Sequence, residues 1–274
     1  PEMLAPVYER LRSRQINLVL GDGVAQFAAD ANGGITVTTA SGAVYPTDLV
    51  ILGIGVRPEN TLAKAAGLTI GDRGGIRVNE RMQTSDPTIW AVGDVVEVKD
   101  FVTGEWTVIP LAGPANRQGR IAADVICGRD ATFRGVQGTS VCGVFGLAIS
   151  TTGGNEKNLQ RLGWDYGKVY LHPGQHASYY PNVRSIGLKL LFSNQDGRIL
   201  GAQAVGEEGT DKRIDVIAMA LQTGATVFDL EEAELCYAPQ FGAAKDPVNM
   251  AGMIAANAIR GDAPLVHWQQ LPDL

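Results

Sequence analysis

Apolar residues follow two spacings along this chain, and each spacing predicts a different kind of regular structure. Short apolar-rich runs predict buried strands at three places in the first half: residues 15–20, 48–54 and 89–92. Apolar positions three or four residues apart predict helices at three others: residues 3–14, 61–66 and 115–127. Strands and helices mixed in this order predict an α/β fold for the first half of the chain.

The pattern changes after Gly128-Arg129-Asp130, where we expect a domain boundary. Four strands are predicted beyond it, with a hairpin turn between the last two: residues 141–150, 165–171, 188–194 and 199–205. Helices are predicted at residues 210–222 and 227–234. This order predicts an α+β domain, in which an antiparallel sheet carries helices on one side.

Gly21-Asp22-Gly23 follows the first predicted strand, at the place where a dinucleotide phosphate loop would stand. The third glycine of that motif is missing, because Gln26 occupies its position, and no helix is predicted next. Gly33-Gly34 and the alternating residues 35–38 instead predict a β-hairpin. We therefore expect a turn here and no phosphate site.

The composition narrows the class of protein. A chain of 274 residues, 45% of them hydrophobic, can bury a substantial core. The net charge is -6, and the 23 basic and 29 acidic residues are interspersed, which offers no basic surface for nucleic acid or an anionic membrane. No apolar run approaches the roughly 18 residues of a membrane span, and the first residues lack a signal-peptide pattern, so we expect a cytoplasmic protein.

The cysteines and histidines predict neither a disulfide framework nor a metal site. Cys127, Cys142 and Cys236 stand far apart without a C-x-x-C pair, and we expect each to be a buried thiol. The three histidines, at positions 172, 176 and 267, share no ligand spacing.

Residues 84–94 carry the strongest chemical signal. The run 89–92 predicts a buried strand, and Gly93 lets the backbone approach a ligand where that strand ends. Asp94 then presents an acceptor-only side chain, which suits a polyol hydroxyl. Further along, residues 111–114 open a predicted helix, whose first N–H groups and positive dipole end can face an electron-rich ligand.

The segment 84–94 closely resembles the second flavin-binding motif of FAD-dependent pyridine nucleotide-disulfide oxidoreductases. Residues 53–60, G-x-G-x-R-P-x-N, are similar to the turn at which that family's chain returns from the NAD(H) domain to the FAD domain. The resemblance implies that Asp94, after Gly93, holds the ribityl chain of FAD. It also implies that Leu111 and Ala112 touch the isoalloxazine ring, with FAD as cofactor and NAD(P)H as co-substrate.

Two segments of the second half carry tyrosines suited to chemistry, residues 176–181 and 235–249. Tyrosine hydroxyls can donate to a thiolate, although taken alone such a pair more often occupies half-buried strand positions. The second segment resembles the interface domain of coenzyme A-disulfide reductases and the related NADH oxidases and persulfide reductases. That resemblance implies a homodimer, in which Tyr237 and Tyr179, with Tyr180 as the alternative, reach the partner's reactive cysteine and bound coenzyme A.

The Tyr237 loop stands where relatives of glutathione reductase carry a catalytic His-Glu pair, which favours the coenzyme A-disulfide branch of the family. Lys245 and Asp246, at the end of the same segment, are expected to form an interface or surface pair and to take no part in catalysis.

The resemblance divides the chain into four parts: 1–52, the end of an NAD(P)H-binding domain; 53–131, part of an FAD-binding domain; 132–262, a dimerisation domain; and 263–274, a tail or a linker toward a rhodanese domain. The family's G-x-G-x-x-G motif for FAD and its redox cysteine are not found in these residues. We therefore expect a catalytically incomplete part of an NAD(P)H-dependent flavoprotein reductase of coenzyme A disulfide or persulfide. An NADH oxidase or peroxidase of the same family, and a non-catalytic dimerisation module, are the alternatives.

Overall fold

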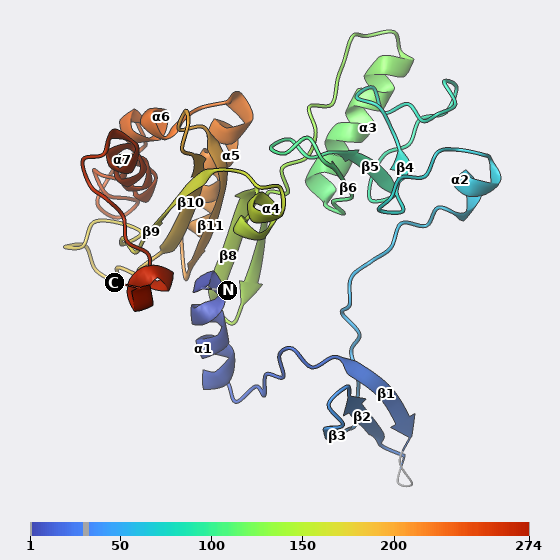
Figure 1. The fold of residues 1–274 in the computed structure, drawn as a ribbon, viewed down its shortest axis with the longest axis horizontal. Helices are drawn as coiled ribbons and strands as arrows, with labels where there is room; N and C mark the ends of the chain where they lie inside the picture. Colours follow the sequence, from blue (N-terminus) through green and yellow to red (C-terminus); the bar gives the residue numbers. More distant parts are fainter. Residues whose placement is uncertain (1, 30–32, 274) are drawn as a thin grey trace. The chain divides into compact units, whose positions relative to one another are not determined.

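A computed structural model describes residues 2–29 and 33–273, and the chain forms two compact units. One unit is Ala5–Arg57, and the other joins Pro1–Leu4 to Pro58–Leu274. The ribbon traces the helices and strands of each unit (Figure 1).

The described part of the unit Ala5–Arg57 contains a helix and a three-stranded antiparallel sheet. Its elements are α1 (Ala5–Ser13), β1 (Val24–Ala29), β2 (Ile35–Thr39) and β3 (Val44–Thr47). The predicted hairpin is confirmed by the pairing of β1 with β2, and β3 adds a third strand that was not predicted. In the turn before β3, the Ser41 hydroxyl donates to the Asp22 carboxylate at 2.6 Å, so Asp22 closes a turn.

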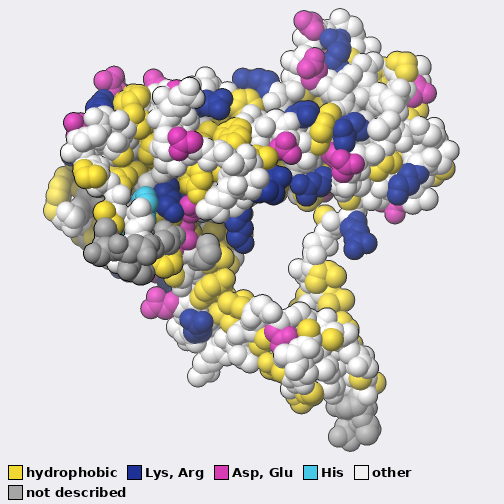
Figure 2. Space-filling view, in the orientation of Figure 1, with side chains coloured by type: hydrophobic (Ala, Val, Ile, Leu, Met, Phe, Trp, Pro, Cys, Tyr) yellow, Lys and Arg dark blue, Asp and Glu magenta, His cyan; other side chains and the backbone are white. Residues whose placement is uncertain are grey.

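Two strands predicted in this unit are wrong, because residues 15–20 and 48–54 form no strand. Leu52 is 63% exposed and Ile54 is 88% exposed, and hydrophobic side chains lie open on the surface of this unit (Figure 2). A strand needs a neighbour that pairs with its backbone N–H and C=O groups. Among the described residues of this unit the sheet contains only β1, β2 and β3, so these apolar runs find no strand to join.

The second unit begins with a region packed around helix α3. Its elements are α2 (Thr61–Ala65), β4 (Ile76–Arg77), β5 (Val96–Lys99), β6 (Trp106–Thr107) and α3 (Ala112–Ile126), while η1 (Glu2–Leu4) belongs to the same unit but lies against the sheet described below. Strand β5 pairs parallel with β4 and antiparallel with β6, and its Val96 and Val98 pack with Ala122 of α3 in a small core. The helices predicted here are confirmed, and Ile126, at the end of α3, is 59% exposed.

The strand predicted at residues 89–92 is also wrong. Trp90 makes only an isolated bridge to Gln83, and Val92 is 38% exposed. The strand of this region is β5, which begins two residues after Asp94. Asp94 therefore lies in a turn that enters a strand, where we had expected it at the end of one.

A five-stranded antiparallel sheet forms the rest of the second unit. Its strands lie in the order β7-β8-β11-β10-β9 and are β7 (Ser140–Val144), β8 (Leu147–Gly153), β9 (Tyr166–Leu171), β10 (Gly187–Ser193) and β11 (Ile199–Gly206). The segment predicted as one strand over residues 141–150 is two strands, because a turn at Phe145 and Gly146, both with positive φ, reverses the chain. The other three predicted strands and the antiparallel sheet are confirmed.

Helices cover both faces of this sheet, which corrects the expectation of helices on one side. Three helices share the larger core with Leu188 and Leu190: α5 (Thr210–Thr223), α6 (Val227–Glu232) and α7 (Pro247–Arg260). A shorter helix, α4 (Glu156–Arg161), packs Leu159 against Leu191 and Leu200 from the other face. The last described element is the 3-10 helix η2 (Trp268–Asp273). Helix α7 was not predicted, although Pro247 at its first turn follows an Asp cap, a standard helix start.

Candidate functional site

Two loops of the second unit bring Tyr179 and Tyr237 together. The first loop, residues 172–186, joins β9 to β10, and the second, residues 233–246, joins α6 to α7. The two phenol oxygens lie 3.0 Å apart, within hydrogen-bond distance, although 58 positions separate the residues in sequence. Tyr179 is 75% exposed and Tyr237 is 48% exposed, so the pair can meet a molecule at the surface.

Tyr180, the alternative to Tyr179, occupies a different environment. Its ring packs edge-on against the buried His176, with 5.7 Å between the ring centroids. The hydroxyl contact to Tyr237 is made by Tyr179. The geometry thus favours Tyr179 as the first member of the pair.

The backbones of the two loops are also bonded to each other. The Ala177 N–H donates to the carbonyl of Gly242 at 2.9 Å and to that of Pro239 at 3.3 Å. The tyrosines therefore project from two segments that are joined below their side chains, which limits how far the phenols can separate.

Asp246, the last residue of the second loop, is buried and is not a surface residue, which corrects the expected pairing with Lys245. Its side chain is 3% exposed and accepts from the guanidinium of Arg213 at 2.8 Å. The same carboxylate caps α7 by accepting from the Val248 N–H at 3.0 Å. A buried carboxylate is tolerated here because both a guanidinium and a helix N-terminus satisfy it.

The contact between the phenols also affects their acidity. The hydrogen bond with Tyr179 raises the pKa of Tyr237 above its ordinary value. Tyr237 therefore keeps its proton to a higher pH than a free tyrosine does. A neutral phenol held beside a second phenol can donate a hydrogen bond to a sulfur that becomes a thiolate.

The turn that carries Asp94 is fastened to helix α3. Gly93 has a φ of +86°, which favours glycine, and its N–H donates to the side-chain oxygen of the buried Gln118 at 2.8 Å. Asp94 itself is exposed. The predicted acid thus stands beside the helix that follows residue 111, with its carboxylate open to a ligand.

The first backbone N–H groups of helix α3 can donate hydrogen bonds to a ligand. Leu111 is its N-cap residue and supplies no side-chain hydrogen bond, and Ala112, the first helical residue, is exposed. The first N–H groups of a helix lack partners within the helix and carry its positive dipole end. An acceptor-only carboxylate and an uncapped helix N-terminus in one region fit the polyol chain and the electron-rich ring of a flavin.

Gln118 and Arg213 were not predicted from the sequence. Gln118 lies at an inward position of an amphipathic helix, and a single polar residue there gives no signal of its partner. Arg213 is the fourth residue of α5 and is 2% exposed, and no role was predicted for it. The three cysteines were predicted wrongly as well, because Cys127, Cys142 and Cys236 are all free and exposed.

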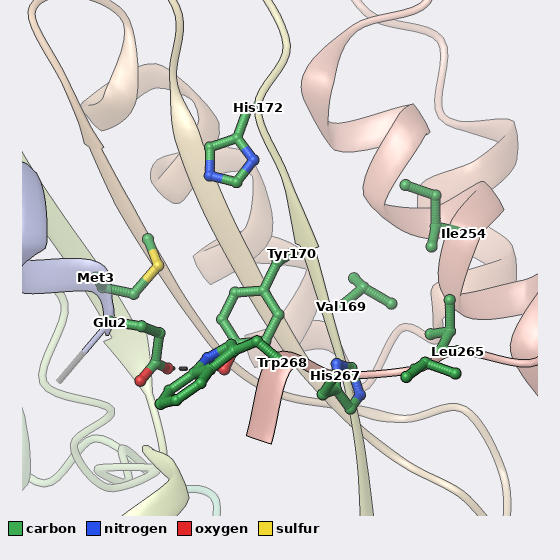
Figure 3. Close-up of a pocket in the computed structure, with 10 residues that line it drawn as sticks. Glu2, Met3, Val169, Tyr170, His172, Ile254, Leu265, His267 and Trp268 are labelled. Carbon is green, nitrogen blue, oxygen red and sulfur yellow. Dashed lines mark hydrogen bonds between the residues drawn. The ribbon is translucent and has the colours of Figure 1, made fainter. Parts of the chain in front are cut away.

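A cavity of about 340 Å³ lies beside β9 in this unit (Figure 3). Its polar lining includes Glu2, Tyr170 and His267. The Glu2 carboxylate accepts from the Tyr170 hydroxyl at 2.7 Å and from the ammonium of Lys189 at 2.5 Å. These contacts hold the segment Glu2–Leu4 on the sheet, so we assign the cavity wall a structural role.

No helix in the described part of the chain is long and apolar enough to cross a membrane. Within the same residues, no group of three or more His, Cys, Asp or Glu side chains is arranged to hold a metal ion.

Both halves of the chain match known protein families. Residues 1–119 match the family described as pyridine nucleotide-disulphide oxidoreductase, and residues 139–247 match the dimerisation domain of the same family. The sequence is 37% identical over 242 residues to an NAD(P)H sulfur oxidoreductase (CoA-dependent) of Pyrococcus furiosus, covering 88% of this chain and 54% of that protein. It is 33% identical over 252 residues to a coenzyme A disulfide reductase of Staphylococcus aureus, covering 92% of this chain and 56% of that protein.

Solved structures agree with these matches. Reduced CoADR-RHD of Bacillus anthracis superposes with a TM-score of 0.95 at 50% identity, over 99% of this chain and 48% of that one. An NAD-dependent persulfide reductase from A. fulgidus gives a TM-score of 0.94 at 36% identity, over 99% of this chain and 50% of that one. The chain therefore spans about half the length of the relatives it matches.

The predicted α/β part followed by an antiparallel α+β dimerisation domain is confirmed, and so is the assignment to enzymes that use FAD and NAD(P)H. The chain belongs to the pyridine nucleotide-disulphide oxidoreductases.

Proposed function

We propose that the protein carrying this chain is an NAD(P)H-dependent flavoprotein disulfide reductase whose acceptor is coenzyme A disulfide or a persulfide. The observation that carries this proposal is the contact between Tyr179 and Tyr237, 3.0 Å between phenol oxygens on two exposed loops. The names of the relatives from Pyrococcus furiosus and Staphylococcus aureus support the choice of coenzyme A.

Reduction of a disulfide takes up two electrons and two protons and releases two thiols. FAD, when bound, supplies the electrons that it receives from NAD(P)H. Tyr237 donates a hydrogen bond to the sulfur that leaves, which stabilises the negative charge that develops there. Tyr179 shares a hydrogen bond with the Tyr237 hydroxyl and orients it, and because each phenol carries one proton, this bond leaves one proton of the pair for the sulfur.

Four residues of this chain would hold FAD. Asp94 would accept from hydroxyls of the ribityl chain, and Gly93 would keep the turn close to α3 through its bond to Gln118. Leu111 and Ala112, at the uncapped start of α3, would lie against the ring. We keep these four roles as proposals, together with the division of the chain at residues 52, 131 and 262.

We further propose that the protein acts as a homodimer, because residues 139–247 match a dimerisation domain. In this arrangement the exposed tyrosine pair faces the reactive cysteine of the partner subunit and its coenzyme A. Sedimentation at micromolar concentration should give a dimer, and a stable monomer would contradict this part of the proposal.

The direct test is Tyr237→Phe in the full-length enzyme, with coenzyme A disulfide as substrate. Loss of one hydrogen bond to a charged sulfur should lower turnover by about 10- to 100-fold, while FAD stays bound. Tyr180→Phe is the matched control and should leave turnover close to wild type. Unchanged turnover in Tyr237→Phe would mean that the residue only packs.

An NADH oxidase is the second candidate, favoured by the 36% identity over 253 residues to an NADH oxidase of Methanocaldococcus jannaschii. Rates of NAD(P)H consumption with coenzyme A disulfide and with oxygen, measured on one preparation, decide between the two activities. A non-catalytic dimerisation module is the third, and a purified protein without the flavin absorbance band would support it.

A further inference from the structure

We propose that Arg213 is a positioning residue, which sets the separation of Tyr179 and Tyr237 by holding both of their loops. This inference rests on the function proposed above, because it assigns Arg213 a role in the reaction of the tyrosine pair.

One guanidinium touches both loops. The Nη2 group of Arg213 donates to the carbonyl of Gln175, in the first loop, at 2.7 Å and to the carboxylate of Asp246, at the end of the second loop, at 2.8 Å. Its Nε group donates to the other oxygen of Asp246 at 3.3 Å. Arg213 is thus the charged group that joins the two loops through side-chain contacts.

These contacts lie directly below the tyrosines. Gln175 precedes Ala177 by two residues, and the Ala177 N–H bonds to the carbonyl of Gly242 in the second loop at 2.9 Å. A side-chain carbon on Gly242 would stand 3.9 Å from Nη2 of Arg213, so the guanidinium reaches the point where the loops meet. A change in the length or shape of residue 213 therefore acts on both tyrosine backbones.

Arg213 is itself held on a rigid support. It lies in α5, whose Ile214 and Ile217 belong to the main core, and Nη1 donates back to the carbonyl of Gly209 at 3.3 Å. Gly209 has a φ of +73°, and a side-chain carbon there would stand 2.5 Å from Nη1. The guanidinium fills this site, which fixes where its fork points.

Lysine cannot reproduce this arrangement. An ammonium keeps the charge that pairs with Asp246, but it lacks the planar fork that reaches a carbonyl and a carboxylate at once. Arg213→Lys therefore keeps the ion pair and loses the bridge to Gln175, which should let the two loops move apart.

The first readout is the ionisation of Tyr237, followed by tyrosinate absorbance in the intact protein. Each variant is compared with the same variant carrying Tyr237→Phe, so that the difference reports the ionisation of Tyr237 and of the phenol bonded to it, and no other tyrosine. Tyr179→Phe removes the hydrogen bond that raises the pKa of Tyr237 and should lower that pKa. Arg213→Lys should lower it in the same direction, because the phenols separate.

Arg260→Lys is the matched control for this experiment. Arg260 pairs with Glu231 at 2.9 Å on the surface of the same domain and touches neither loop. The Arg260→Lys variant should therefore leave the ionisation of Tyr237 unchanged. An Arg213→Lys protein in which Tyr237 titrates as in the wild type would overturn the proposal.

The double variant Arg213→Gln with Asp246→Asn serves where Arg213→Lys does not fold. It removes both charges together, so no charge stays buried without its partner. It should lower the pKa of Tyr237 as Arg213→Lys does, and a wild-type titration in this variant would also overturn the proposal.

The second readout is kinetic. Arg213→Lys should lower kcat with coenzyme A disulfide by about 10- to 100-fold, the cost of a misplaced catalytic group, with FAD bound and KM for NAD(P)H unchanged. If Arg213→Lys shifts the ionisation of Tyr237 but keeps the wild-type kcat, a role of Arg213 in the reaction is refuted. The function proposed above fails by a different result, unchanged turnover in Tyr237→Phe, so the two failures are distinguishable.

Discussion

The tyrosine pair and the turn at Asp94 are built in different ways. Tyr179 and Tyr237 bond to each other, and a buried ion pair between Arg213 and Asp246 holds their loops from below. The turn at Asp94 is fastened to α3 through the bond from Gly93 to Gln118, and the carboxylate itself is open. The first site is organised by the chain's own contacts, whereas the second leaves its donors and acceptors for a ligand.

Removing the ion pair should have the largest effect on stability. Arg213→Met leaves the carboxylate of Asp246 buried without its cation, so the free energy of unfolding should fall by about 3 to 5 kcal/mol. Asp94→Ala is the comparison, and it should change the free energy of unfolding by less than about 0.5 kcal/mol because the side chain is exposed. Denaturant unfolding measures both, and equal losses would show that the two sites do not differ in this way.

When FAD binding is measured instead of stability, the larger effect is expected from the change at Asp94. Asp94→Ala in the full-length enzyme should weaken FAD binding by about 1.5 to 3 kcal/mol, the value of a hydrogen bond to a charged group. Asp130→Ala removes an exposed acid paired with Arg81 in the same region and is the control. Equilibrium dialysis gives the affinity, and unchanged FAD retention in Asp94→Ala would refute the ribityl role.

The last prediction concerns Glu156 of α4, which pairs with Lys168 on β9, the strand that leads into the first tyrosine loop. Burial alone raises the pKa of Glu156, but hydrogen bonds from Lys168 and Lys189 outweigh it and lower the pKa from 4.5 to about 2. Because the folded pKa is the lower one, this stabilisation is present above pH 4.5 and is lost as the pH falls through about 2.

Thermal unfolding across that pH range tests this expectation. The wild-type protein should lose stability between the two values, and Glu156→Gln should lose less there. Glu105→Gln, at an exposed position, should follow the wild type. A Glu156→Gln protein that loses stability as steeply as the wild type would show that another group governs the acid transition.

The spacing of apolar residues along the chain was sufficient to predict the antiparallel sheet and most of the helices. Strands β9, β10 and β11 and helix α5 lie where apolar spacing predicted them, because each of them packs on neighbours present in the same part of the chain. The run ending at Ile54 has an equally apolar composition, yet Ile54 is 88% exposed. Apolar spacing therefore predicts which residues can form a buried strand, and a neighbouring strand decides whether they do.

The residue types of the candidate site could be read from the chain, since Asp94, Leu111, Ala112, Tyr179 and Tyr237 all stand in segments with a distinctive order of residues. The contacts that hold these residues in place could not be predicted from the sequence. The bond from Gly93 to Gln118 spans 25 positions, and the pair of Arg213 with Asp246 spans 33. Such partners are set by how loops and helices pack, and a buried arginine has the same letter in the sequence as an exposed one. The sequence by itself determined which side chains are available for the chemistry of this protein. Packing between residues far apart in the chain decided which of those side chains contact each other and which face solvent.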